Sequence, residues 1–246
     1  EFYLEVTESI RENDQNHIIF LEGDHFAMQF DCIHEIRDEN TALTFHYYPT
    51  VWEPELFEDT YDKAARCRKF QEILDQIAGI REKFHRPILC GEAGYDIDKN
   101  NLPHTLELLD ETLTMFNEAE ISWTLWCYKD ARFMGMVYPK EESSWMQLVE
   151  RIHQSWTHYK EMGQANELMA KIKAWPEFEK ATDELCYFMQ FRQRGILYRF
   201  QTECILKPLL KEYTPEELLE LPKSFLFSEC GYYEEYAKLL KEKVLP

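Results

Sequence analysis

The chain has 246 residues, of which 45% are hydrophobic and 15% aromatic, with only 8 Gly and 10 Pro. This composition supplies enough apolar side chains for a real core and excludes a disordered or low-complexity segment. The 27 Lys and Arg residues against 46 Asp and Glu residues give a net charge of −19, which would repel nucleic-acid phosphates and an anionic membrane surface. We therefore expect neither nucleic acid nor a membrane as a partner.

The ends of the chain and its cysteines say little about the compartment. The chain begins at Glu1 without an initiator Met, so we expect a processed product or a piece of a longer protein. It contains no run of about 18 uncharged apolar residues and no signal-peptide pattern. The seven cysteines are an odd number without a C-x-x-C pair, which indicates reduced thiols rather than disulfides or a zinc knuckle. A secreted and a cytoplasmic location both stay open.

Up to about residue 158, short apolar runs alternate with longer amphipathic stretches, as is typical of an α/β fold. Helix and strand follow one another at about 40 residues per unit, which suits consecutive right-handed βα crossovers onto a parallel sheet. Each short run is apolar through its middle, which predicts a strand buried on both faces. We predict strands over 17–24, 42–48, 86–94 and 121–130, helices over 1–13, 60–84, 106–119 and 144–158, and an irregular segment over 26–40.

The strand signals stop beyond Tyr159, and the remaining residues predict helices broken at four prolines. Thr214, Pro215 and Glu217 have the spacing of an N-cap, a first-turn proline and a capping-box acid. We therefore expect two parts, an α/β part over residues 1–158 and a helical extension of unknown role over residues 159–246.

Polar and aromatic residues stand where the predicted strands end. Because reactive groups collect at the carboxyl ends of parallel strands, we expect these residues to share one cleft. An acid, an imidazole, a phenol and an indole together can bind and act on a sugar ring, since aromatic rings pack on its apolar face and a carboxylate can attack the anomeric carbon. The residues are Glu22, Asp24, His46, Tyr48, Glu92 and Trp126.

Four segments in this order resemble glycoside hydrolase family 5, in the clan of retaining (β/α)8-barrel cellulases. IRENDQNHIIFLEG resembles the fourth helix and fifth strand of that family, and TFHYYP resembles its sixth-strand His-x-Tyr motif. PILCGEAG resembles the seventh strand, which carries the nucleophile, and WTLWCYKD resembles the eighth strand. The resemblance covers residues 1–158 and implies strands five to eight of a TIM-type barrel.

The resemblance also implies roles for individual residues. Glu92 would be the nucleophile, Tyr48 would donate a hydrogen bond to its carboxylate, His46 would contact a sugar hydroxyl, and Trp126 would form the floor under the sugar. Each residue also has a purely structural alternative. The Glu92 carboxylate could cap the next helix, and Trp126 could pack against neighbouring side chains. His46 and Tyr48 could lie in the core and form hydrogen bonds with backbone groups.

Two further residues are weaker candidates for sugar binding. Asp24 follows the first strand and Trp52 lies in the loop PTVWEP, but a strand-end acid is often a cap and a loop Trp often packs. The pairs of His and acidic residues elsewhere lack convergent spacing for a metal site. We therefore predict no metal and no cofactor.

The chain departs from the family at the acid/base residue. That residue lies in an Asn-Glu-Pro motif at the end of the fourth strand, and no such motif occurs here. The expected function is retaining hydrolysis of a β-linked oligo- or polysaccharide, such as a β-1,4-glucan or a hemicellulose, with the help of the missing N-terminal half-barrel. The alternative is a truncated or degenerate half-barrel that binds glycan or acts as an interaction module without catalysis.

Overall fold

The computed structural model describes the chain in two compact units. Unit 1 comprises Glu1–Tyr138 and Tyr232–Pro246, and unit 2 comprises Pro139–Gly231. Each unit is described by itself below. The described residues are 1–49, 62–97, 102–131, 133–156, 170–180 and 182–244.

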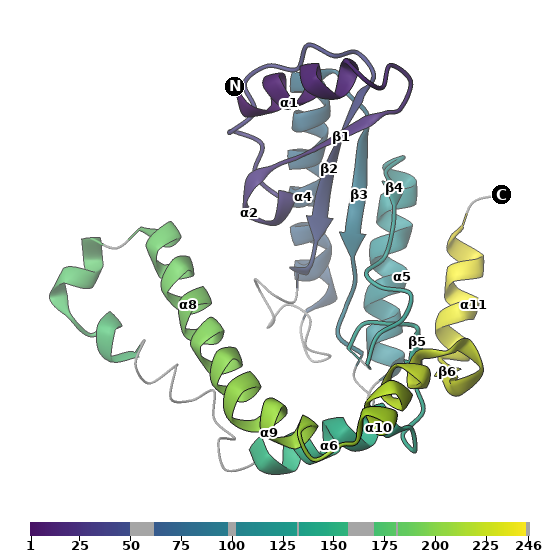
Figure 1. Ribbon diagram of the computed structural model, residues 1–246. Coiled ribbons are helices and arrows are strands. Elements are labelled where there is room, and N and C mark those ends of the chain that lie inside the picture. Colours follow the sequence, from purple (N-terminus) through teal and green to yellow (C-terminus); the bar gives the residue numbers. More distant parts are fainter. Residues whose placement is uncertain (50–61, 98–101, 132, 157–169, 181, 245–246) are drawn as a thin grey trace. The chain divides into compact units, whose positions relative to one another are not determined.

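Unit 1 is built on a four-stranded parallel sheet with the order β1-β2-β3-β4 (Figure 1). Neighbours in the sequence are neighbours in the sheet, which confirms the predicted succession of parallel βα units. The last strand is shorter than predicted, but the chain continues beside β3, because the Trp126 backbone N–H donates to the Ala93 carbonyl at 2.9 Å. The strands are β1 (Ile19–Glu22), β2 (Thr41–Tyr47), β3 (Ile88–Ala93) and β4 (Ser122–Trp123).

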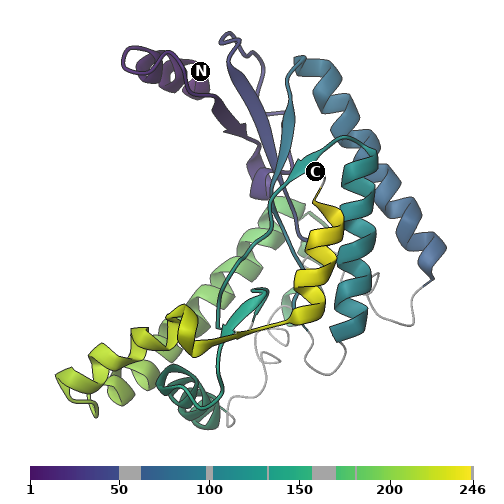
Figure 2. The same ribbon diagram turned by 90° about the vertical axis from the view of Figure 1, so that its right-hand side faces the viewer.

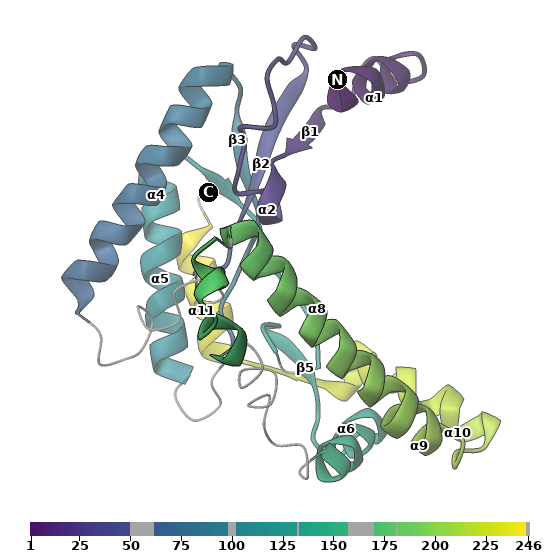
Figure 3. The same cartoon turned by 90° about the vertical axis from the view of Figure 1, so that its left-hand side faces the viewer.

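Two long helices cover the same face of this sheet (Figures 2 and 3). They are α4 (Lys63–Phe84) and α5 (Leu102–Glu118), with the shorter helices α1 (Phe2–Arg11), α2 (Asp24–Ala27) and α11 (Glu234–Lys243) in the same unit. The Asp62 side chain caps the start of α4 by accepting from the Ala64 backbone N–H at 3.0 Å. The helix ends at His85, whose φ of 51° is left-handed.

The core lies between the sheet and these two helices. Alternate residues of β2 point to this side, as the period of two in a strand requires. The Phe45 ring packs edge-on against Phe116 of α5 at 6.0 Å, and the Tyr47 ring packs against Phe70 of α4 at 6.0 Å. Phe45, Phe116 and Tyr47 are all at most 2% exposed, so this side of the sheet is fully covered.

The opposite side of β1 is uncovered. Leu21 is buried, whereas Ile18 and Phe20, which point the other way, are 56% and 48% exposed. The prediction that every strand is buried on both faces is therefore wrong for β1. The reason is that β1 packs against the core through the side of Leu21 alone.

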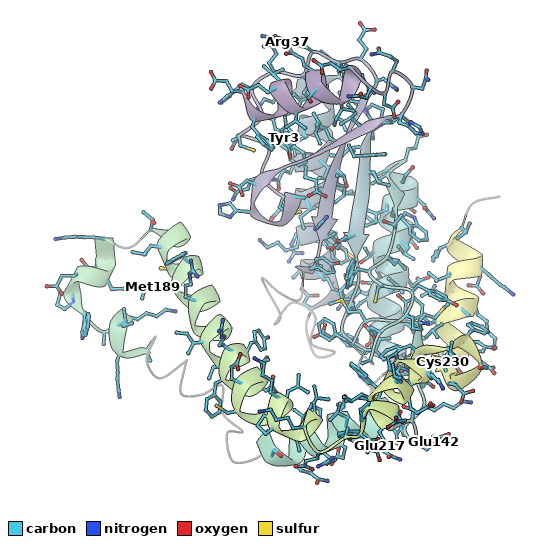
Figure 4. All side chains as sticks on the ribbon, viewed as in Figure 1. Tyr3, Arg37, Glu142, Met189, Glu217 and Cys230 are labelled. Carbon is cyan, nitrogen blue, oxygen red and sulfur yellow. The ribbon has the colours of Figure 1, made fainter. Side chains whose placement is uncertain are left out.

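Unit 2 is mostly helical, as predicted. The capping box at Thr214 and Glu217 is present, because each side chain accepts a hydrogen bond from the backbone N–H of the other residue. Glu217 is labelled in Figure 4. In the described part of the chain, no helix has the length and apolar character needed to cross a membrane. The helices are α6 (Ser144–Trp156), η3 (Pro176–Lys180), α8 (Asp183–Gln201), η4 (Thr202–Leu206), α9 (Lys207–Leu210), α10 (Pro215–Glu220), η5 (Leu221–Phe225) and η6 (Phe227–Glu229).

The end of the chain differs from the expected helical extension. Two short strands, β5 (Val137–Pro139) and β6 (Cys230–Tyr232), pair with each other, so the prediction of no strand beyond residue 159 is wrong. A three-residue strand rich in small and polar residues is too short to give an alternating pattern.

Helix α11 packs on α5 within unit 1. The Lys243 ammonium lies 2.7 Å from an Asp110 carboxylate oxygen, and the Asn117 amide donates to the Lys243 carbonyl at 2.8 Å. The contacts therefore separate residues 139–231 as one unit and place residues 232–246 with the sheet, whereas the sequence suggested a single division at residue 158.

Candidate active site

Three neighbouring strands bring polar side chains to one end of the sheet. Glu22 ends β1, His46 lies near the end of β2, and Glu92 lies near the end of β3. The strands are parallel, with Glu22 opposite Thr44 and His46 opposite Glu92. Their carboxyl ends therefore meet at one edge of the sheet, where α/β enzymes place their functional groups.

A bulge in β3 turns Glu92 to the side of His46. Phe45 pairs with Cys90 and His46 pairs with Glu92, so one step along β2 matches two steps along β3. The extra residue is Gly91. Without the bulge, strict alternation would place Glu92 on the core side with Cys90, which is fully buried. The bulge therefore re-aims the carboxylate away from the core.

Gly91 is required at the bulge by close approach. A Cβ atom at this position would lie 2.3 Å from the Thr44 hydroxyl oxygen on β2. Only a residue without a side chain fits between the two strands there. The Gly before the candidate nucleophile thus belongs to the geometry that presents it.

Tyr48 donates a hydrogen bond of 2.7 Å to Oε2 of Glu92. This is the hydrogen bond that the resemblance led us to expect. Burial, and then the hydrogen bond to the Glu92 carboxylate, raise the pKa of Tyr48 well above its usual range. The phenol therefore stays protonated at neutral pH and can donate to Glu92.

The two oxygens of Glu92 differ in their surroundings. Oε2 receives the Tyr48 hydroxyl and also faces the His46 ring, whereas the described residues provide no hydrogen bond to Oε1. The Glu92 side chain is 31% exposed. One carboxylate oxygen is thus held by the protein while the other can meet a ligand.

His46 lies between two carboxylates. Its Nδ1 is 3.5 Å from Oε2 of Glu92, and its Nε2 is 3.5 Å from Oε1 of Glu22. The His46 side chain is only 15% exposed, and its ring stands edge-on to the Tyr48 ring at 6.3 Å. Both ring nitrogens therefore face acidic groups of the protein itself, whereas we expected His46 to face a sugar hydroxyl.

Trp126 lies beside the end of β3. Its backbone N–H bonds to Ala93, the residue after Glu92, and its side chain is 51% exposed. A Cβ atom on Gly94 would lie 2.5 Å from the Trp126 carbonyl oxygen, so this glycine allows the Trp126 segment to approach. The Trp123 indole, three residues earlier, donates to Asn117 of α5 at 2.9 Å.

The two weaker candidates have different outcomes. Asp24 is the first residue of α2 and is exposed, and its Oδ1 accepts from the His25 backbone N–H at 2.7 Å, whereas the N-cap of this helix is Gly23. Together with Glu22 it lines an open pocket of about 420 Å³ beside α1, where Tyr3 donates to the Glu22 carbonyl (Figure 4). Trp52 lies outside the described residues.

Glu22 was expected among the strand-end residues of the cleft, but the sequence analysis gave it no role. It was visible only as a strand-end acid, and its contact with His46 depends on the register between β1 and β2. Among the described residues, no group of three or more His, Cys, Asp or Glu side chains is placed to hold a metal ion.

Comparison with known proteins identifies the family of the chain. A family model described as cellulase (glycosyl hydrolase family 5) matches residues 1–132. A β-xylosidase of Phanerodontia chrysosporium is 29% identical over 161 residues, which cover 60% of this chain and 33% of that protein.

Solved structures with similar folds include the cellulose synthase subunit Z of Clostridioides difficile. Its TM-score is 0.46 and its sequence identity is 15%, and the match covers 54% of this chain and 48% of that chain. Endoglucanase Cel5A of Thermotoga maritima has a TM-score of 0.41 and 18% identity over 55% of this chain and 47% of that chain. The chain thus spans about half the length of these proteins and a third of the β-xylosidase. Because the family model matches more than half of its residues, the chain belongs to glycosyl hydrolase family 5.

Proposed function

We propose that this chain supplies the nucleophile half of a retaining glycoside hydrolase, with β1 to β4 as strands five to eight of a (β/α)8 barrel. The observation that carries the proposal is the Glu92 carboxylate, which a bulge aims to the site and Tyr48 holds through one oxygen at 2.7 Å. A carboxylate at the end of a parallel strand, with one oxygen free, has the position and the charge to attack an anomeric carbon.

In the proposed mechanism, Oε1 of Glu92 forms a bond to the anomeric carbon while the bond from that carbon to the leaving oxygen breaks. The electron pair of the broken bond stays with the leaving oxygen. The Tyr48 phenol remains hydrogen-bonded to Oε2 and orients the carboxylate throughout. Water then attacks the anomeric carbon from the face that the leaving group occupied, and its proton passes to the second carboxyl group of the site. The bond from the anomeric carbon to Oε1 breaks and its electron pair returns to the Glu92 carboxylate, so the product retains the configuration of the substrate.

The substrate class is a β-linked oligo- or polysaccharide, such as a β-1,4-glucan or a hemicellulose. The named relatives support this choice: one is a β-xylosidase, and Cel5A of Thermotoga maritima is described in complex with cellobiose and with mannotriose. A neutral glycan also suits a chain with a net charge of −19. We assign the exposed Trp126 indole to a stacking platform for the sugar, and Asp24 and Trp52 to outer contacts.

A retaining mechanism needs a second carboxyl group about 5 Å from the nucleophile to protonate the leaving oxygen. The Asn-Glu-Pro motif that would supply it is absent from these 246 residues. We assign that group to an N-terminal half-barrel, which would pair with β1 to β4. Cleavage of natural glycans therefore requires the second half-barrel. A substrate whose leaving group departs without a proton can react with Glu92 in the absence of that half.

The test uses such a substrate on the chain as it stands. The reagent is 2,4-dinitrophenyl 2-deoxy-2-fluoro-β-cellobioside, with the corresponding xyloside in parallel. Its phenolate departs without protonation, and the fluorine slows hydrolysis of the glycosyl-enzyme. We expect one glycosyl group to add to the protein, a 2-deoxy-2-fluorocellobiosyl group from the first reagent or a 2-deoxy-2-fluoroxylosyl group from the second, as measured by intact-protein mass spectrometry, together with release of one dinitrophenolate.

The matched variants are Glu92→Gln, which keeps the shape of the side chain and removes its charge, and Glu39→Gln, which makes the same change at an exposed residue before β2. We expect no adduct with Glu92→Gln and the full adduct with Glu39→Gln. An adduct that persists in Glu92→Gln would refute the nucleophile role. Binding of cello-oligosaccharides without any adduct would favour the non-catalytic glycan-binding module.

A further inference from the structure

Glu22 holds a position that suggests a function beyond strand termination. It is the last residue of β1, and its side chain points to the same side as Phe20, away from the core that buries Leu21. That is the side on which His46 and Glu92 lie. The carboxylate therefore faces the candidate site across β2.

The backbone around Glu22 is fixed from three directions. Its carbonyl accepts the Tyr3 hydroxyl of α1 at 2.8 Å, and its strand is paired with β2. The next residue is Gly23, where a Cβ atom would lie 2.4 Å from the Gln29 carbonyl oxygen. The chain must therefore turn sharply after Glu22, and this turn holds the end of β1 in place.

The His46 ring is confined between Glu22 and Glu92. The distances from Nε2 to Glu22 and from Nδ1 to Glu92 are both 3.5 Å, longer than an N–H···O hydrogen bond of about 2.7–3.2 Å. Contacts of this kind in ligand-free sites often shorten when a ligand binds. With a carboxylate beyond each ring nitrogen, rotation of the ring would break both contacts together.

We infer that Glu22 is a positioning residue, which acts through His46 to orient the Glu92 carboxylate. The Glu22 carboxylate lies 3.5 Å from Nε2 of His46, and this contact sets the plane of the ring and the direction of Nδ1. Nδ1 faces Oε2 of Glu92, the oxygen that Tyr48 also holds. The Glu22–His46 pair and Tyr48 thus fix one oxygen from two sides and leave Oε1 to react. This inference rests on the proposed role of Glu92.

The first test measures the rate of labelling by 2,4-dinitrophenyl 2-deoxy-2-fluoro-β-cellobioside. We expect Glu22→Gln to slow labelling about tenfold, because a small misplacement of a reacting group costs one to two orders of magnitude in rate. Glu39→Gln makes the same chemical change at the other end of the sheet and should label at the wild-type rate. An unchanged rate in Glu22→Gln would overturn the inference.

A double-mutant cycle separates positioning from a general structural effect. If Glu22 acts through His46, the Glu22→Gln change should have no further effect in a His46→Asn background. Equal slowing in both backgrounds would mean that Glu22 acts independently of His46, which contradicts the inference.

A readout that needs no reaction keeps the two proposals distinguishable. The ¹⁵N chemical shifts of the His46 ring report which nitrogens carry protons. We expect them to change in Glu22→Gln and to stay unchanged in Glu39→Gln. If the wild-type chain gives no adduct, the proposed function fails, and these shifts still decide whether Glu22 positions His46. Unchanged shifts in Glu22→Gln would reject the positioning role whatever the labelling result.

Discussion

At the scale of single residues, the site depends on how Glu92 is presented rather than on its presence alone. A strand with strict alternation would send this side chain into the core beside the fully buried Cys90. The bulge at Gly91 reverses that direction. The residue before Glu92 thus determines where the carboxylate points.

The Gly91→Ala variant tests this dependence. Its Cβ atom would meet the Thr44 hydroxyl oxygen at 2.3 Å, so we expect a loss of about 1–3 kcal/mol in the free energy of unfolding, measured by urea denaturation. The Gly91→Ala and Thr44→Ala double variant should lose less than the sum of the two single changes. Thr44→Ser keeps the hydroxyl oxygen and should bring no such relief. Additive losses would show that the close contact is unimportant.

The sequence predicted which polar side chains gather at the strand ends better than it predicted their contacts. Strand ends indicated Glu92, His46 and Tyr48, and the hydrogen bond between Tyr48 and Glu92 is present. The contact between His46 and Glu22 was not predicted, because it depends on the register of two strands separated by an irregular segment. Register is set by packing of the whole sheet and is not visible in one strand.

At the scale of elements, α4 and α5 are joined by an ion pair beneath the sheet. Arg66 of α4 is 3% exposed, and its guanidinium makes two hydrogen bonds to Glu111 of α5, at 2.9 and 3.2 Å. Lys63 adds a contact of 2.5 Å to the same carboxylate. Burial acts to raise the pKa of Glu111, but the hydrogen bonds from Arg66 and Lys63 outweigh it and lower the pKa overall.

This ion pair predicts a pH dependence of stability. Because the pKa of Glu111 is lower in the folded state, its contribution is complete above the usual glutamic acid value of about 4.3 and is lost as the pH falls through the folded value. We expect Glu111→Gln to destabilise the protein by about 2 kcal/mol at pH 7 and to lose less stability on acidification. Urea denaturation at pH 7 and at pH 3 measures both effects.

A control lies one helical turn away in the same helix. Glu107→Gln changes an exposed carboxylate that contacts Lys63 at 3.3 Å and should cost less than about 0.5 kcal/mol. If Glu107→Gln and Glu111→Gln had equal effects, the burial of Arg66 would have no energetic consequence.

The elements themselves were predicted where their hydrophobic pattern is long. Helix α4 and strand β2 follow the expected ranges closely, since each has a full face to bury. The return of α11 to α5 was not predicted, because it depends on specific contacts of Lys243 with Asp110 and Asn117. Such contacts join residues more than a hundred positions apart.

At the scale of the whole molecule, the described sheet of unit 1 has four parallel strands and an uncovered side at β1. A closed barrel of this type has eight strands. Unpaired strand edges beside exposed apolar residues favour association with another chain. The open sheet is therefore consistent with the proposal that β1 to β4 require a second half-barrel.

We expect the isolated chain to self-associate through this side. Phe20→Lys places a charge on the exposed side of β1 and removes about 1.5–3 kcal/mol of stabilisation by apolar burial in the self-associated state. We therefore expect roughly a tenfold or larger rise in the dissociation constant for self-association. Leu219→Lys is the control, since Leu219 is 71% exposed in unit 2. Analytical ultracentrifugation over a range of concentrations compares them. A wild-type chain that stays monomeric throughout would contradict the expectation.

The most direct test of the central claim is the anomeric configuration formed by Glu92→Ala in the presence of azide. With 2,4-dinitrophenyl β-cellobioside as substrate, azide would occupy the space of the deleted carboxylate and attack from its side. We predict an α-cellobiosyl azide, identified by the ¹H NMR coupling constant of the anomeric proton. A β-azide, or an azide product formed equally well by the unsubstituted chain with the same α configuration, would contradict the assignment of Glu92 as the nucleophile.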